Sequence, residues 1–218
     1  MLAREGYSTI VAVFVFSALV VLGVSYAPDW IGYIIYPLAG ALCLLVLFFF
    51  RDPERSVPAG QERLVISPAD GKIVQVQTID EPAYINGKAT QISIFLSPLD
   101  VHVNRVPVSG KVEYVKYYPG QYLMAWEDRA SEMNEQAHFG VLHPSGMKML
   151  FKQITGFLAR RIVYYIEEGD QIKAGERFGI MKFGSRMDIL LPESIQINVK
   201  KGDRTVAGES ILGEIPTR

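Results

Sequence analysis

The chain has 218 residues, of which 49% are hydrophobic and 21% charged, and its net charge is −1. The balance of 22 basic and 23 acidic residues argues against a nucleic-acid-binding protein, which needs a basic face. The single cysteine excludes a disulfide framework and a cysteine-based zinc site, and the three histidines lack metal-ligand spacing, so we expect no metal site.

Two long uncharged segments open the chain. They are residues 6–28 and 30–50, and only Asp29 separates them. Each is close to the ~20 apolar residues that a helix needs to cross the core of a bilayer. The sequence therefore predicts a membrane helical hairpin over residues 1–50.

The flanking charges predict the orientation of this hairpin. Arg4 precedes the first segment and Arg51 follows the second, so the positive-inside rule places both ends and the remainder of the chain in the cytoplasm, at the cell membrane. A cleaved signal peptide ending at Ala27 is an alternative, although Pro28 directly after the cut disfavours it. A re-entrant hairpin that enters one leaflet is another.

The remaining residues, 51–218, predict a mainly β domain. Short apolar runs between glycine and proline turns predict strands at 72–78, 91–96, 101–106, 111–117, 141–143, 147–153, 161–167 and 195–199. One segment, 123–136, has apolar residues at helical spacing and predicts the one helix of this domain.

An internal repeat refines the fold class. Residues 166–176 read IEEGDQIKAGE and residues 199–209 read VKKGDRTVAGE, so each copy predicts a strand–turn–strand unit with Gly-Asp at the turn. SPADGKI (67–73) and VPVSGKV (106–112) form a second related pair. We expect a duplicated β-sandwich that resembles lipoyl and biotinyl carrier domains, with one short helix.

The first candidate site is the pair Gly184-Ser185. A Gly-Ser pair is usually a simple turn, but here it lies beside an apolar strand-like run. The Ser185 hydroxyl could attack the Gly184 carbonyl and convert the peptide bond to an ester. Elimination would then cut the chain and leave dehydroalanine, which hydrolyses to a pyruvoyl group. Such a ketone forms a Schiff base with an amine and acts as an electron sink.

Two further candidates contain titratable residues. In SPLDVHVNR (97–105), strand alternation places Asp100, His102 and Asn104 on one face, where His102 could act as an acid or base. A half-exposed histidine on an edge strand is the alternative. Asp70 lies in the Pro-Ala-Asp-Gly turn, which needs no function to explain it.

Six segments together carry a resemblance to a known family: FFFRDPER (48–55), SPADGKI (67–73), FLSPLDVHVNR (95–105), PGQYLMAWEDRASEMNEQ (119–136), ARRIVYYIEEGD (159–170) and FGSRMDILLP (183–192). Over residues 48–213 the chain resembles the short form of the pyruvoyl-dependent phosphatidylserine decarboxylase proenzymes.

The resemblance implies an activity and a maturation step. The expected reaction is decarboxylation of phosphatidylserine to phosphatidylethanolamine, through a Schiff base to a covalent pyruvoyl group derived from Ser185. Cleavage between Gly184 and Ser185 would give a β chain, 1–184, and an α chain, 185–218. The expected partners are an anionic phospholipid with an ester or ether backbone, the membrane and the two chains of one proenzyme, with a homodimer as an option.

The resemblance also implies roles for single residues. Asp70 corresponds to the processing acid, and His102 to the group that protonates the substrate carbon after CO₂ leaves. Longer members of the family carry a second histidine where this chain has Arg105, so either His102 serves both steps or another base activates Ser185.

Arginines are candidates for binding the substrate phosphate, because a guanidinium fork matches its oxygens. The candidates are Arg160, Arg161 and Arg105, with Arg186 as a further option. Paired arginines on a strand that only face solvent are the alternative reading.

Two functions from other classes compete with this reading. A membrane-anchored adaptor with lipoyl-like repeats would need coiled-coil heptads, which the sequence lacks. A membrane-bound serine hydrolase could use Ser185 with Lys182 or His102, but the G-x-S-x-G motif is missing and its chain would stay uncut.

Overall fold

The computed structural model describes residues 1–127, 129–157, 161–182 and 184–216. The chain divides into two compact units, Met1–Glu54 and Arg55–Arg218. Each unit is described by itself.

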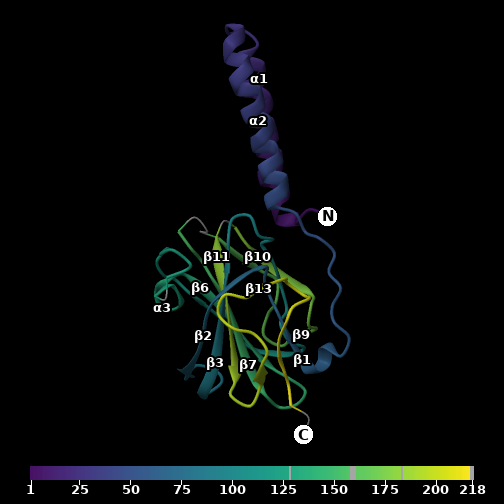
Figure 1. The fold of residues 1–218 in the computed structure, drawn as a ribbon, viewed down its shortest axis with the longest axis vertical. Helices are drawn as coiled ribbons and strands as arrows, with labels where there is room; N and C mark the ends of the chain where they lie inside the picture. Colours follow the sequence, from purple (N-terminus) through teal and green to yellow (C-terminus); the bar gives the residue numbers. More distant parts are fainter. Residues whose placement is uncertain (128, 158–160, 183, 217–218) are drawn as a thin grey trace. The chain divides into compact units, whose positions relative to one another are not determined.

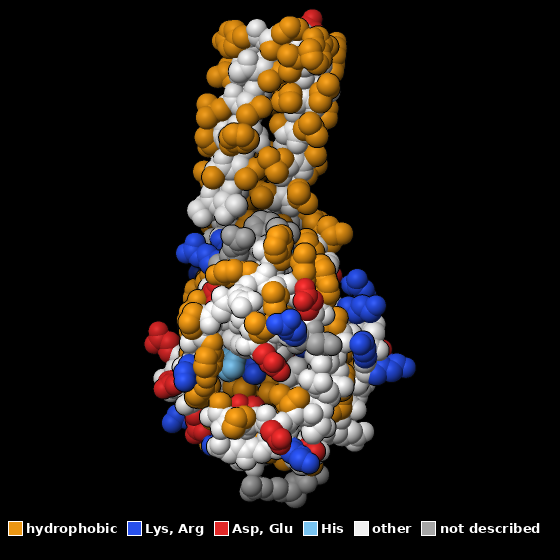
Figure 2. All heavy atoms as spheres, turned by 90° about the vertical axis from the view of Figure 1, so that its left-hand side faces the viewer, with side chains coloured by type: hydrophobic (Ala, Val, Ile, Leu, Met, Phe, Trp, Pro, Cys, Tyr) orange, Lys and Arg blue, Asp and Glu red, His pale blue; other side chains and the backbone are white. Residues whose placement is uncertain are grey.

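The first unit is a pair of helices joined by a short turn (Figure 1). A single turn of 3-10 helix, η1 (Arg4–Gly6), leads into α1 (Tyr7–Val24), and α2 spans Asp29–Phe49. Both helices are long and apolar enough to cross a membrane. Their large apolar side chains are exposed, as Phe16 (61%) and Leu44 (69%) illustrate, and Figure 2 shows hydrophobic side chains covering this unit. Such a surface is unfavourable in water and is consistent with membrane association.

The two ends of the hairpin are tied together by backbone hydrogen bonds. The Ala3 N–H donates to the Phe50 carbonyl (2.8 Å), and the Asp52 N–H donates to the Met1 carbonyl (2.8 Å). Both ends of the helical pair therefore lie at the same end of this unit, as a hairpin requires.

The second unit is built almost entirely from antiparallel strands. Its elements are η2 (Gln61–Arg63), β1 (Leu64–Ile66), β2 (Gly71–Glu81), β3 (Gly87–Leu96), β4 (Val103–Arg105), β5 (Gly110–Tyr118), α3 (Ala130–Met133), β6 (Gln136–Leu142), β7 (Lys148–Ile154), β8 (Ile162–Tyr164), β9 (Gln171–Ile172), β10 (Arg177–Met181), β11 (Ser185–Pro192), β12 (Gln196–Ile197), β13 (Arg204–Thr205) and β14 (Ile211–Glu214).

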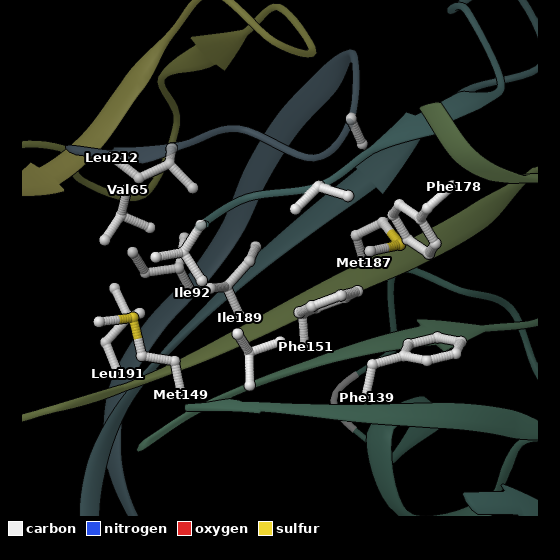
Figure 3. Packing of buried hydrophobic residues seen from close by; sticks show 14 of the residues in the cluster. Val65, Ile92, Phe139, Met149, Phe151, Phe178, Met187, Ile189, Leu191 and Leu212 are labelled. Carbon is white, nitrogen blue, oxygen red and sulfur yellow. The ribbon is translucent and has the colours of Figure 1, made fainter. Parts of the chain in front are cut away.

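Three sheets enclose one hydrophobic core. The largest is a curled sheet in the order β13-β2-β3-β11-β7-β6-β5-β9, and the smaller sheets are β1-β14-β12 and β4-β10-β8. Phe151 on β7 packs against Phe139 on β6 (ring centroids 5.2 Å apart) and Phe178 on β10 (5.1 Å), and Val65 and Leu212 of the β1-β14-β12 sheet join the same core (Figure 3). The core thus joins all three sheets, and the mainly β fold class is confirmed.

The internal repeat is a repeat in structure. Gly202 donates its N–H to the Ile73 carbonyl (2.8 Å), and Gly169 donates to the Val112 carbonyl at the same distance. Both glycines have left-handed φ angles, 101° and 100°, which glycine adopts without steric cost. β13 pairs with β2 as β9 pairs with β5. The duplication predicted from the sequence is therefore confirmed.

The sequence was misleading in one segment. Among the described residues of the predicted helix at 123–136, only α3 is α-helical, because the segment folds back on itself instead. The Gln121 N–H donates to the Met133 carbonyl (2.7 Å), and the Glu135 N–H donates to the Gln121 carbonyl (3.0 Å). The end of the predicted helix lies in β6. We call residues 119–135 the cover loop.

Candidate functional site

The Gly184-Ser185 pair lies at the start of β11, a central strand of the large sheet. Ser185 pairs with Leu96 on β3, and the next residue, Arg186, pairs with Ile154 on β7. The Ser185 side chain is fully buried, and its Oγ has no hydrogen-bond partner within the part of the chain that the structure describes. A buried hydroxyl without a partner is costly for stability.

His102 contacts the residue that precedes this hydroxyl. The His102 Nδ1–H donates to the Asp100 carbonyl (2.9 Å), which leaves the Nε2 lone pair to accept the Gly184 N–H (3.2 Å). This pattern requires a neutral imidazole with its proton on Nδ1. The structure therefore brings two of the sequence candidates, His102 and the Gly184-Ser185 pair, into one site.

The Gly184 carbonyl faces a second glycine, Gly156. A Cβ built on Gly156 would lie 2.4 Å from the Gly184 oxygen and 3.0 Å from the Ala125 Cβ. Gly184 itself has a φ of 66°, so it too adopts a conformation that favours glycine. Because Gly156 has no side chain, its backbone can lie close to the Gly184 carbonyl. This contact restricts where the carbonyl oxygen can lie.

Asn134 holds the cover loop to the segment that contains Gly156. Its Nδ2 donates to the carbonyls of Leu123 (2.9 Å) and Thr155 (2.8 Å), and its Oδ1 accepts the Leu123 N–H (2.9 Å). The side chain is almost completely buried, at 1% exposure. Asn134 thereby ties the loop that contains Ala125 to the residue next to Gly156.

A buried amide pair borders the same interior face. Gln153 on β7 lies opposite Met187, two residues along β11 from Ser185, and its Nε2 donates to Asn104 Oδ1 (2.9 Å). Both side chains are fully buried, and among the described residues Asn104 Nδ2 and Gln153 Oε1 have no partner. Asn104 Nδ2 can donate a hydrogen bond to a bound polar group, and Gln153 Oε1 can accept one. Gln153 was missed in the sequence, because a single glutamine in an apolar strand carries no motif.

Asp70 lies in a different set of contacts. Its carboxylate forms an ion pair with Arg55 (2.8 Å) and accepts the Ala207 N–H (2.8 Å), and its side chain is 17% exposed. These contacts anchor the turn before β2 to the turn before β14. Its role in processing stays a prediction.

The arginine candidates lie in different environments. Arg105 is 6% exposed and donates to the Gly175 carbonyl (2.9 Å) in the first copy of the repeat, whereas Arg161 is exposed just before β8. Arg160 lies outside the described residues.

Arg186 is fully buried, and its guanidinium is occupied by internal partners. It donates to Asp188 Oδ1 (2.7 Å), Gln75 Oε1 (2.7 Å), Ser93 Oγ (2.6 Å) and the Glu127 carbonyl (3.2 Å). This residue joins the sheet to the cover loop and has no exposed face for a phosphate.

Among residues 1–127, 129–157, 161–182 and 184–216, no group of three or more His, Cys, Asp or Glu side chains is placed to hold a metal ion.

Comparison with known proteins supplies the family. A model of the phosphatidylserine decarboxylase family matches residues 42–213. A phosphatidylserine decarboxylase proenzyme of Salinibacter ruber is 53% identical over 189 residues, which is 86% of this chain and 83% of the relative. The proenzymes of Symbiobacterium thermophilum and Geobacter metallireducens are 44% and 45% identical over 216 residues, covering 99% of this chain and 96% and 97% of theirs.

Proposed function

This chain belongs to the phosphatidylserine decarboxylase family, and on that premise we propose that it releases CO₂ from the serine headgroup of phosphatidylserine and leaves phosphatidylethanolamine. The observation that carries the proposal for this site is the buried Ser185 hydroxyl, which has no partner among the described residues and follows Gly184, whose N–H is bound by His102. Neither the adaptor nor the hydrolase reading explains why this hydroxyl follows a glycine held in a left-handed conformation.

Self-cleavage would begin with Ser185. Its Oγ attacks the Gly184 carbonyl carbon, the C–N bond breaks, and the amine of residue 185 is released while an ester forms. Removal of the Ser185 Hα then breaks the Cβ–O bond, which frees the Gly184 carboxylate and leaves dehydroalanine. Hydrolysis expels ammonia and yields the pyruvoyl group at the start of an α chain, 185–218, with 1–184 as the β chain.

The residues around Ser185 have the chemistry that a pyruvoyl group at this position would need beside it. Once formed, it supplies an electrophilic carbonyl that binds the substrate amine and accepts the electron pair left by departing CO₂. The neutral His102 Nε2 lies beside the cut and can hold the proton that the substrate carbon needs after CO₂ leaves. Asn104 Nδ2 offers a hydrogen-bond donor to the polar headgroup.

We further propose that the helical hairpin anchors the enzyme in the cytoplasmic membrane. The length and apolar composition of α1 and α2, and Arg4 and Arg51 beside them, support an anchor with the catalytic unit on the cytoplasmic side.

The direct test is intact-mass spectrometry of the purified chain together with Ser185→Ala. The native chain should yield two fragments, the smaller starting at residue 185 with a ketone in place of the amine, and should release CO₂ from phosphatidylserine vesicles. Ser185→Ala should stay whole and inactive. A native chain that remains uncut yet hydrolyses esters would support the hydrolase reading instead.

A further inference from the structure

The two copies of the repeated turn have opposite charge. The first copy reads Glu-Glu-Gly-Asp-Gln (167–171), and the second reads Lys-Lys-Gly-Asp-Arg (200–204). Their backbones form equivalent hydrogen bonds to β5 and β2. The fold therefore does not dictate the charge of either turn, and the basic character of the second copy needs another explanation.

The basic turn lies beside an exposed tryptophan. Lys201 and Lys72 line, with Trp126, a hollow of about 300 Å³, and both lysines are exposed. The Trp126 ring packs edge-on against Phe95 (centroids 5.4 Å apart), yet 54% of the residue remains exposed. A large, partly exposed aromatic side chain thus shares this hollow with two cations.

The basic turn also reaches the loop before His102. Arg204 on β13 contacts Asp100 (3.4 Å), and the neighbouring Leu99 is 64% exposed. Two nearby acidic groups are engaged with backbone: Asp100 accepts the Ser97 N–H (2.8 Å), and Asp203 accepts the Lys200 N–H (2.9 Å). Glu127, next to Trp126, is exposed, and the surface keeps more basic than acidic side chains.

This region borders the cleavage site. Phe95, under Trp126, precedes Leu96, which pairs with Ser185. Ala125, next to Trp126, lies against Gly156. This surface is therefore one residue along β3 from the partner of Ser185.

We propose that this surface, formed by Lys72, Lys200, Lys201, Arg204, Trp126 and Leu99 and called here the basic-aromatic surface, docks onto an anionic phospholipid bilayer. Lysines and arginines near an anionic bilayer are attracted to its headgroups. Trp and exposed aliphatic side chains favour the interface between headgroups and acyl chains. The proposal rests on the proposed function, since a bilayer lipid as substrate requires the site to meet the membrane surface.

The test uses the full chain in lipid nanodiscs, with Trp126 as the reporter. The sequence has two tryptophans, Trp30 and Trp126, so Trp30→Phe leaves Trp126 as the only one. Nanodiscs contain phosphatidylcholine alone or with phosphatidylglycerol, an anionic lipid without the serine headgroup, and brominated acyl chains serve as quenchers. We expect Trp126 quenching and a blue-shifted emission in the anionic discs, both reduced by high salt.

Charge variants separate docking from net charge. Lys72→Gln combined with Lys201→Gln should lower the ratio of docked to undocked protein by on the order of tenfold or more, since each lysine near such a surface contributes about a fivefold factor. The matched control is Lys111→Gln combined with Lys173→Gln, which removes the same charge beside the acidic copy of the turn and should leave quenching unchanged.

Three results would overturn the proposal: equal quenching in neutral and anionic discs, equal effects of the two double variants, or shielding of Trp126 that depends on protein concentration in detergent, which would indicate a second copy of the chain. Self-cleavage is followed by mass in every sample. An uncut native chain whose Trp126 is still quenched would reject the proposed function and leave the docking surface standing.

Discussion

Gly156 lies directly against the carbonyl oxygen of Gly184, so close that a Cβ on Gly156 would approach that oxygen to 2.4 Å. Because the neighbour is backbone, it cannot rotate away as a flexible side chain could. The position of the carbonyl that Ser185 is proposed to attack therefore depends on Gly156, which lies just after the end of β7. Asn134 and the cover loop hold that residue in place.

Gly156→Ala should slow self-cleavage by on the order of 10²-fold, because a displacement of about 1 Å at a reacting centre has effects of that size. The measurement is the fraction of cut chain over time, by mass. Gly87→Ala is the matched control, since a Cβ there meets nothing within 4 Å. Cleavage of a folded Gly156→Ala chain at the native rate would contradict the importance of this contact.

His102→Gln should separate cleavage from decarboxylation. Glutamine can still accept the Gly184 N–H, but it cannot carry a proton as an imidazole does, so the chain should be cut and decarboxylation should fall by about 10²- to 10⁴-fold. The measurements are fragment masses and CO₂ release from phosphatidylserine vesicles. An uncut variant would show instead that His102 also serves Ser185 during processing, in place of the second histidine that this chain lacks.

Arg186 and Arg161 should respond differently to replacement by methionine. Arg186→Met leaves Asp188 buried without its cation, which should lower the free energy of unfolding by roughly 3–5 kcal/mol. Arg161→Met, at an exposed position, should change it by less than about 0.5 kcal/mol. Urea unfolding on the uncut Ser185→Ala background measures both. If the Arg186 variant kept its stability and lost only substrate affinity, the phosphate role considered from the sequence would regain support.

The sequence predicted the β class and the duplication because both depend on local patterns. Turn glycines and alternating apolar residues are visible within ten residues, and Gly169 and Gly202 take the same conformation in both copies. The Gly-Ser pair was recognisable in the same way. These features can be recognised without knowing which distant segments of the chain are in contact.

Features that depend on distant segments were not predictable. Arg186 was considered from the sequence as a phosphate ligand, but it is buried with Asp188, and the cover loop contacts the pair through Ser131 and the Glu127 carbonyl. The same loop has a helical pattern, yet Asn134 binds Leu123 and Thr155 instead of extending α3. In both cases, contacts between segments far apart in the sequence decide where these residues lie.

The last prediction concerns His138, on β6. Burial, together with the charges of Lys152 and Lys116, lowers the pKa of His138 to about 3. Its Nε2–H donates to Gln136 Oε1 (2.8 Å), and its ring lies against the ring of Tyr118 (centroids 4.6 Å apart). The folded state therefore holds this histidine neutral.

In the unfolded chain the same histidine has its ordinary pKa of about 6.5. The unfolded state thus binds the proton first as the pH falls, so the stability that His138 contributes is complete above pH 6.5 and is lost progressively as the pH falls from there toward 3. On the Ser185→Ala background, the free energy of unfolding should fall between pH 7 and pH 5 by about 2 kcal/mol more with His138 than with His138→Gln. Urea unfolding at the two pH values gives this difference, with the exposed-site variant Asn198→Gln as control. Parallel pH dependence of all three chains would mean that folding leaves the pKa of His138 near its ordinary value.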